Sequence, residues 1–247
     1  MICSTPAFVL KTYDFRETSK IAVFFSRDFG KVKGVLKGIR RDPKKFSSVL
    51  SALSLNHIVF YQKRNSEIHL VSQCDLIDDF GLFRGQLQAF RSSNRVIEMV
   101  DLLLPLEDPH REVFDLMFNF LNTLKTNPHL APVLFQIKIL ALSGFKPRFD
   151  SCVVCESKIV QSAYFSHSKG GLLCPSCLRR DPLAEEALPG TIASILYIEK
   201  SEWSKSLRLQ FSPPIKKQLE MILNCFFHFH VGKKMKTIHP DLDVLDL

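Results

Sequence analysis

The amino-acid sequence predicts an α+β protein in which a small β-barrel precedes an α-helical domain. Three observations predict this class. Short apolar segments rich in β-branched and aromatic residues fill the first 80 positions, apolar residues recur at helical spacing after position 81, and four cysteines form two close pairs between positions 152 and 177. We therefore expect two domains, residues 1–80 and residues 81–247, with a metal-binding insert in the second at about 150–180.

Five segments of the N-terminal region have the pattern of strands, at 8–12, 20–26, 31–37, 53–61 and 68–76. Gly30 supplies the tight turn between the second and the third, and at Gly34 we expect a bulge or a sharp curl. Five short, curled strands with a basic loop after the third predict an OB-fold, an architecture that binds oligonucleotides. An SH3-like barrel has nearly the same sequence pattern.

Helical periodicity predicts five helices in the C-terminal region, at 82–104, 111–123, 132–143, 191–202 and 214–231. Between the third and the fourth, the aromatic pair Tyr164 and Phe165 and the Gly170-Gly171 turn indicate a small hairpin. The second domain is thus expected to be helical, with the cysteine-containing module inserted into it.

Cys152, Cys155, Cys174 and Cys177 form a C-x2-C-x18-C-x2-C array, which is typical of a structural Zn²⁺ site. Because all four ligands come from the protein, no coordination position is left for water or substrate, and the ion is expected to stabilise the fold. The main alternative is a fold that persists without the metal. His167 lies between the pairs, and we expect it to be a surface residue of the hairpin.

Other uses of these cysteines are less favoured. Disulfides require an oxidising compartment, and no basic segment of a secretory signal precedes the apolar start of the chain. A thioredoxin-like pair would explain only one C-x2-C, and iron-sulfur clusters use tighter or less symmetric spacings. We expect a cytoplasmic, nucleoid-associated protein with no membrane partner, since no apolar run approaches the ~20 residues of a membrane span.

Basic residues outnumber acidic ones by 33 to 25, and most of the excess lies between positions 31 and 45. Charge alone favours a polyanionic partner without identifying it, but this stretch lies on a predicted OB-fold strand and the loop after it. It is therefore the candidate nucleic-acid-binding site, here taken as a DNA-binding site, with the residues Lys31, Lys33, Lys37, Arg40, Arg41, Lys44 and Lys45. A solvated loop is the alternative interpretation. A second basic set, Lys233, Lys234 and Lys236, would bind DNA or a partner, or would only stabilise a helix end. Phe29, Phe46 and Tyr61 could stack bases, but we expect them in the core.

The order of short motifs resembles the RecO family of bacterial recombination mediators. In the N-terminal region these motifs are Ala7-Phe8-Val9-Leu10, Glu17-Thr18-Ser19, Phe29-Gly30-Lys31-Val32 and Lys37-Gly38-Ile39-Arg40-Arg41. Further along they are residues 135–142, Gly144-Phe145, Pro147, Cys152-Val153-Val154-Cys155 and residues 230–237. The resemblance covers almost the whole chain.

This resemblance implies an N-terminal OB-fold and a helical C-terminal domain with a zinc site. It also implies binding of single- and double-stranded DNA, annealing of complementary strands, and association with RecR and with the acidic C-terminal tail of single-stranded-DNA-binding protein. The resemblance further implies that these activities help RecA load onto coated strands. No nucleophile elbow, P-loop or paired-carboxylate motif is present in the sequence, so we expect no enzymatic activity.

Two other functions stay open. The first is a zinc-ribbon protein that binds RNA or acts in transcription. The second is a zinc-stabilised nuclease or another nucleic-acid-modifying enzyme. Relative affinity for DNA and RNA would test the first, and turnover of labelled DNA with a divalent metal would test the second.

Overall fold

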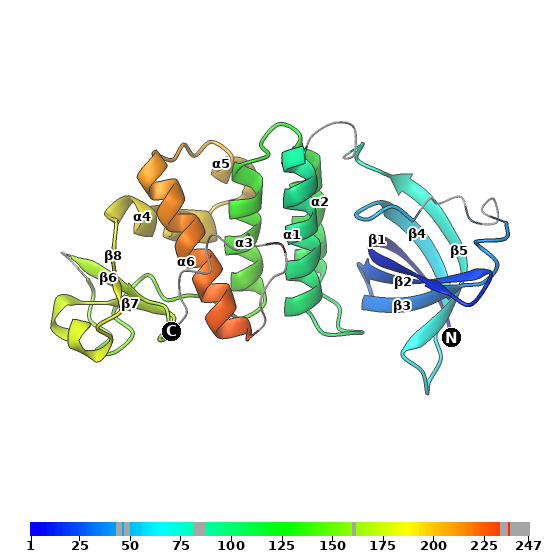
Figure 1. The fold of residues 1–247 in the computed structure, drawn as a ribbon, viewed down its shortest axis with the longest axis horizontal. Helices are drawn as coiled ribbons and strands as arrows, with labels where there is room; N and C mark the ends of the chain where they lie inside the picture. The colour runs from blue at the N-terminus through cyan, green and yellow to red at the C-terminus, as the bar shows by residue number, and fades with distance from the viewer. Residues whose placement is uncertain (43–45, 47–49, 82–86, 160–161, 233–236, 238–247) are drawn as a thin grey trace. The chain divides into compact units, whose positions relative to one another are not determined.

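The computed structural model describes residues 1–42, 46, 50–81, 87–159, 162–232 and 237 (Figure 1). The chain forms two compact units. The first comprises Met1–Ser93 and Leu104–Lys125, and the second comprises Asn94–Leu103 and Thr126–Leu247. Among the described residues, no helix combines the length and the hydropathy that a membrane crossing requires.

The first unit contains a closed five-stranded barrel, as the sequence predicts. Its strands are β1 (Ile2–Phe15), β2 (Ser19–Ser26), β3 (Gly30–Leu36), β4 (Leu55–Tyr61) and β5 (Ile68–Asp78). They close in the order β1-β2-β3-β5-β4, with β3 and β5 parallel and every other pair antiparallel. This is the OB-like arrangement.

Strand β1 is longer than the predicted segment because it pairs on both sides. Its first half pairs with β4 from Ile2 to Phe8, and its second half pairs with β2 up to Phe15. A register shift between Val9 and Lys11 marks an irregularity in the β1–β2 pairing. One bent strand thus closes the barrel.

The two glycines of this region have different roles. Gly30 has φ +65°, as expected for the tight turn between β2 and β3. At Gly34 the pairing of β2 with β3 continues without a register shift, so the expected bulge is absent there. A Cβ at Gly34 would lie 2.4 Å from Val71 Cγ2, so glycine is required because β3 and β5 approach closely.

The barrel is packed on its inside and on part of its outside. Buried side chains such as Val9, Phe24 and Phe60 belong to the interior cluster. On the outside, helix α2 (Arg111–Leu124) places Phe114 against Phe8 and Phe25, with ring centroids 4.7 and 5.9 Å apart. Burial on both faces explains why β1 and β2 contain continuous apolar runs instead of strict alternation.

The second unit is a helical bundle with a small sheet inserted. Its helices are α3 (Leu130–Leu142), α4 (Pro189–Lys200), α5 (Trp203–Ser206) and α6 (Pro213–Val231), together with the part of α1 (Leu87–Leu103) from Asn94 onward. Helix α3 contacts both α4 and α6. A buried polar group links three helices, because the Arg95 guanidinium of α1 donates to side-chain oxygens of Gln136 on α3 and Asn224 on α6.

The insert between α3 and α4 contains the predicted hairpin. Strand β6 (Ala163–Ser166) pairs with β7 (Gly171–Leu173), and a third strand, β8 (Glu185–Ala187), pairs with the other edge of β6. A 3₁₀ helix, η2 (Pro175–Arg180), follows β7. The short elements β8 and α5 were not predicted from the sequence.

Candidate metal centre and candidate nucleic-acid interface

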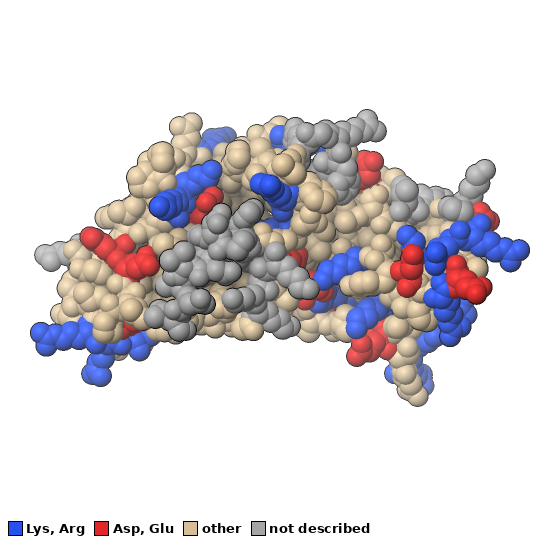
Figure 2. Space-filling view, viewed as in Figure 1, with Lys and Arg blue, Asp and Glu red and all other residues tan. Residues whose placement is uncertain are grey.

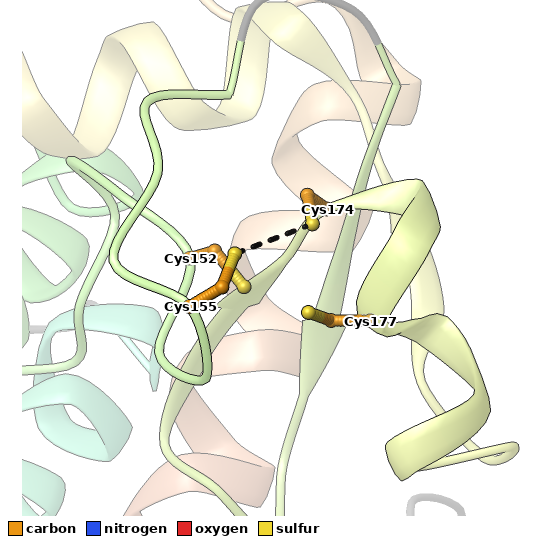
Figure 3. A group of neighbouring side chains, drawn as sticks. All are labelled: Cys152, Cys155, Cys174 and Cys177. Carbon is orange, nitrogen blue, oxygen red and sulfur yellow. Dashed lines mark hydrogen bonds between the residues drawn. The ribbon is translucent and has the colours of Figure 1, made fainter.

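The four cysteines of the insert converge on one point (Figure 3). Each C-x2-C pair lies in a tight turn. The Glu156 N–H donates to the Cys152 carbonyl at 3.0 Å, and the Cys177 N–H donates to the Cys174 carbonyl at 3.0 Å. Strand β7 ends immediately before Cys174, and η2 carries Cys177 back toward the first pair. The sheet and the 3₁₀ helix therefore bring together two turns that are far apart in sequence.

The geometry of this cluster fits a tetrahedral metal ion. The four sulfur atoms lie within 4.8 Å of one another, and the Cys155 and Cys174 sulfurs are 3.7 Å apart. A tetrahedron with Zn–S bonds of roughly 2.3 Å has sulfur–sulfur edges of about 3.8 Å. Among the described residues, this is the one group of three or more histidine, cysteine or acidic side chains so placed.

The thiols influence each other's protonation. The Ser157 hydroxyl, 3.0 Å from the Cys155 sulfur, is the largest of several hydrogen-bond contributions that lower the pKa of Cys155 to about 6. Partial burial and the neighbouring sulfurs raise the pKa of Cys177 to about 12. A thiolate thus lies beside a thiol that resists ionisation, and a metal ion would relieve this conflict because it replaces the protons of its ligands.

The expectation that His167 is a surface residue is wrong. Its side chain is buried against two aromatic rings, Phe165 at 5.1 Å and Phe229 at 6.3 Å between centroids. It is not a member of the cysteine cluster. Its backbone carbonyl accepts a hydrogen bond from His230 Nε2 at 2.8 Å. Because a carbonyl can only accept, the Nε2 atom of His230 carries the hydrogen. His167 therefore packs the insert onto α6.

Three of the predicted DNA-binding residues, Lys37, Arg40 and Arg41, are exposed in the turn that follows β3. The Arg40 N–H donates to the Thr18 carbonyl at 3.0 Å, which joins this turn to the turn between β1 and β2. That contact adds two cations the sequence pattern did not indicate, Arg16 and Lys20. Figure 2 shows Lys and Arg side chains gathered over the barrel, with acidic side chains among them.

The acidic side chains limit the strength of this positive surface. Asp14 lies 3.7 Å from Arg40 and 3.9 Å from Lys20. Exposed ion pairs of this kind contribute roughly 0–1 kcal/mol, so a phosphate can compete for the same cations. The cations of this turn can therefore exchange their carboxylate partner for a phosphate.

The other members of the predicted set lie elsewhere. Lys31 is only 6% exposed, because the segment before α2 covers it, and its carbonyl accepts the Glu107 N–H at 2.9 Å. Lys33 is half-buried and pairs with Glu67 at 2.9 Å. Five residues lie outside the described part of the chain, namely Lys44, Lys45, Lys233, Lys234 and Lys236.

Of the three aromatic residues considered for base stacking, two belong to the core. Phe46 is buried in the barrel interior, and Phe29 packs edge-on against Phe60 with centroids 5.4 Å apart. Tyr61 differs, because 45% of it is exposed at the end of β4. The hairpin that follows it carries Lys63 and Arg64, two exposed cations that lie outside the predicted basic stretch.

Two protein-family models together match most of the chain. The family model described as Recombination protein O N terminal matches residues 1–80, and the model described as Recombination protein O C terminal matches residues 84–238. The chain belongs to the RecO family. The resemblance found in the order of its motifs is thereby confirmed.

Curated relatives in the RecO family match over nearly their whole lengths. The chain is 30% identical over 241 residues to the DNA repair protein RecO of Syntrophus aciditrophicus, covering 95% of this chain and 93% of that one. It is also 30% identical over 241 residues to the DNA repair protein RecO of Caldicellulosiruptor bescii, covering 96% of each. The chain is thus a RecO-family DNA repair protein with an OB-like barrel and a clustered set of four cysteines.

Proposed function

We propose that this RecO-family chain is a non-catalytic mediator of DNA repair and recombination that binds single- and double-stranded DNA through its barrel. The observation that carries the proposal is the match of both family models, which together span the barrel and the helical unit. The exposed cations Lys37, Arg40 and Arg41 support it, because phosphate neutralisation with release of counterions is the main source of affinity for nucleic acids.

Annealing of complementary strands follows from the same electrostatics. Two strands repel each other through their phosphates, and a basic surface that holds both lowers that repulsion and raises their local concentration. This mechanism requires no bond-breaking step. It requires only that the cations of the barrel be available to phosphates, as the weak pairing of Arg40 with Asp14 allows.

We assign a structural role to the cysteine cluster. Cys152, Cys155, Cys174 and Cys177 would hold Zn²⁺, which suits four thiolates at this spacing, and the ion would tie the two turns of the insert together. Because all four ligands would be protein sulfurs, the centre would have no open position for catalysis. The insert packs on α6 through His167, so the metal would also stabilise the helical unit.

The helical unit is the proposed site of protein partners. We propose that the chain acts with RecR, binds the acidic C-terminal tail of single-stranded-DNA-binding protein, and so helps RecA load onto coated strands. Exposed cations on this unit, such as Lys200, Arg208 and Lys217, offer charge that complements an acidic tail.

An annealing assay tests the proposal. Complementary strands are coated with single-stranded-DNA-binding protein, and duplex formation is followed with and without this chain. We expect faster annealing, and we expect the gain to shrink when the coating protein lacks its acidic tail. Equal rates with and without the chain would contradict the mediator role.

The alternatives separate in two further measurements. Tighter binding to RNA than to DNA of the same sequence would favour the RNA-binding alternative. Cleavage of end-labelled DNA in the presence of Mg²⁺ or Mn²⁺ would favour a nuclease. We expect a preference for DNA and no cleavage.

A further inference from the structure

The outer face of the barrel carries a line of apolar side chains beside the β4–β5 hairpin. Tyr61 of β4 lies directly opposite Ile2 of β1 on one side and Leu70 of β5 on the other. Directly opposed residues of antiparallel strands point to the same face with Cβ atoms roughly 5 Å apart. Ile2 is 65% exposed and Tyr61 45% exposed, while Leu70 is partly exposed. We call these three residues the Tyr61 platform.

Two cations adjoin this platform on a hairpin that is anchored at both ends. Lys63 and Arg64 follow Tyr61 by two and three residues and are exposed. On the first arm, the Lys63 N–H donates to His69 Nδ1 at 3.3 Å, and His69 Nε2 lies 2.9 Å from Glu107 Oε1. On the second arm, Glu67 is held by Lys33 at 2.9 Å.

These contacts also determine the local charge. A backbone N–H can only donate, so His69 Nδ1 accepts and its Nε2–H donates to the Glu107 carboxylate. The one acid of the hairpin, Glu67, is already neutralised by Lys33. The next acids along β5 are Asp75 and Asp78, which lie opposite His57 and Leu55 in the strand register. These positions on β4 are about 13 Å or more from Tyr61, at ~3.4 Å per residue. The neutral His69 leaves the Glu107 carboxylate charged, so the hairpin and its anchors carry three cations, Lys33, Lys63 and Arg64, against two acids, Glu67 and Glu107. The flank of the platform therefore keeps a net positive charge.

We propose that the Tyr61 platform stacks an unpaired DNA base, while Lys63 and Arg64 hold the phosphates next to it. The inference rests on the proposed DNA-binding function and specifies which form of DNA the barrel binds at this site. An aromatic ring exposed on a strand next to exposed cations suits a single strand, whose bases present free π-faces. In a duplex the bases are stacked on one another, so the ring gains nothing there.

The test measures affinity of the full-length chain for fluorescent oligonucleotides at several salt concentrations. The strands are an oligo(dT), an abasic strand with the same number of phosphates, and a duplex. Tyr61→Ala removes the ring, Tyr61→Leu keeps the apolar packing with Ile2 and Leu70, and Tyr61→Trp enlarges the stacking surface. Tyr197→Ala is the matched control, because Tyr197 on α4 is also 45% exposed.

We expect Tyr61→Ala and Tyr61→Leu to weaken oligo(dT) binding about tenfold, the typical effect of losing one stacked base, with an unchanged salt slope. Tyr61→Trp should bind oligo(dT) at least as tightly as the wild type, and Tyr197→Ala should bind as the wild type does. The abasic strand and the duplex should not distinguish the Tyr61 variants from the wild type. Alanine at both Lys63 and Arg64 should instead reduce the salt slope by about 1.4, at ~0.7 per phosphate contact.

Two results would overturn the platform. Equal loss of affinity for oligo(dT) and for the abasic strand in Tyr61→Ala would show that the ring acts on structure or phosphates and not on bases. Unchanged oligo(dT) binding in Tyr61→Leu would show that no base stacks there. In both cases the proposed function would still stand if charge reversal of Lys37, Arg40 and Arg41 abolished DNA binding. Absence of DNA binding by the wild-type chain would overturn both.

Discussion

The ring of Phe8 on β1 packs against the ring of Phe114 on α2, with centroids 4.7 Å apart. This contact places a helix that follows the barrel by some thirty residues of chain on the outer surface of the barrel itself. Both side chains are buried, Phe8 fully and Phe114 at 5% exposure. The barrel therefore depends on a helix outside its own strands.

We predict that Phe114→Ala destabilises the barrel by about 3–5 kcal/mol, because it removes a buried ring and leaves a cavity beside Phe8. The measurement is urea unfolding of the full chain, followed by a probe in the barrel. Phe118 on the same helix is 41% exposed, so Phe118→Ala should cost clearly less. Equal costs at the two positions would show that α2 does not stabilise the barrel in this way.

The sequence predicted the main elements well where the signal is local. Strand β2 and helix α2 match their predicted segments within one or two residues, because apolar periodicity and turn residues define them. The start of β1 was missed, since Pro6 and the polar residues before it do not have a strand pattern, and its strand form depends on pairing with β4. Strand β8 begins with two glutamates and exists through pairing with β6.

The candidate sites divide in the same way. The cysteine set follows from spacing alone, because each C-x2-C is a self-contained turn. The basic surface depends on contacts between turns, so the sequence did not indicate that Thr18 brings Arg16 and Lys20 toward Arg40. Nor did it indicate that Lys31 would be covered. An apolar stripe or a run of charges in the sequence indicates an apolar or a charged surface. Tertiary packing then decides which residues that surface contacts.

Metal removal should destabilise the helical unit without unfolding the barrel. We predict that a chelator, or Cys174→Ser, lowers the melting temperature of the helical unit and reduces bound zinc, measured by elemental analysis. Cys225 lies on α6 and is not a member of the cluster, so Cys225→Ser should retain the metal. A Cys174→Ser chain with one full equivalent of zinc and unchanged melting would contradict the four-ligand assignment.

His167 should make the helical unit sensitive to acid. Burial lowers the pKa of His167 below its ordinary 6.5, and His230 adds to this effect while Glu185 and Asp181 partly oppose it. Neither ring nitrogen has a hydrogen-bond partner among the described residues. Because the unfolded chain binds the proton more readily, the stability associated with neutral His167 is complete above pH 6.5 and is lost as the pH falls below it.

We therefore predict that His167→Phe loses less stability than the wild type when the pH is lowered from about 7.5 to about 5.5. Thermal unfolding at the two pH values measures this difference. The same substitution at the exposed His129 is the matched control. An identical loss in wild type and His167→Phe would exclude His167 as the source.

The contributions of three side chains to the stability of the bundle should depend on one another, because Arg95 is buried and hydrogen-bonded to Gln136 and Asn224. Burial lowers the pKa of Arg95, and its hydrogen-bond partners Gln136 and Asn224 are neutral. Arg95→Met should destabilise the bundle by several kcal/mol, because it leaves two buried side-chain oxygens without a donor. Replacing all three by apolar residues of similar size should recover much of that loss in chemical denaturation. Failure of the triple variant to exceed Arg95→Met would argue against this network.

Binding of a fluorescent single strand by a charge-reversed barrel tests the central claim most directly. Lys37→Glu, Arg40→Glu and Arg41→Glu are combined and compared with a second triple reversal, at Lys200, Arg208 and Lys217, that changes the net charge equally. We predict that the barrel variant keeps its melting temperature but loses most single-strand affinity, with a salt slope shallower by about 2, while the control binds far better. Equal affinity of the barrel variant and the wild type would contradict the account.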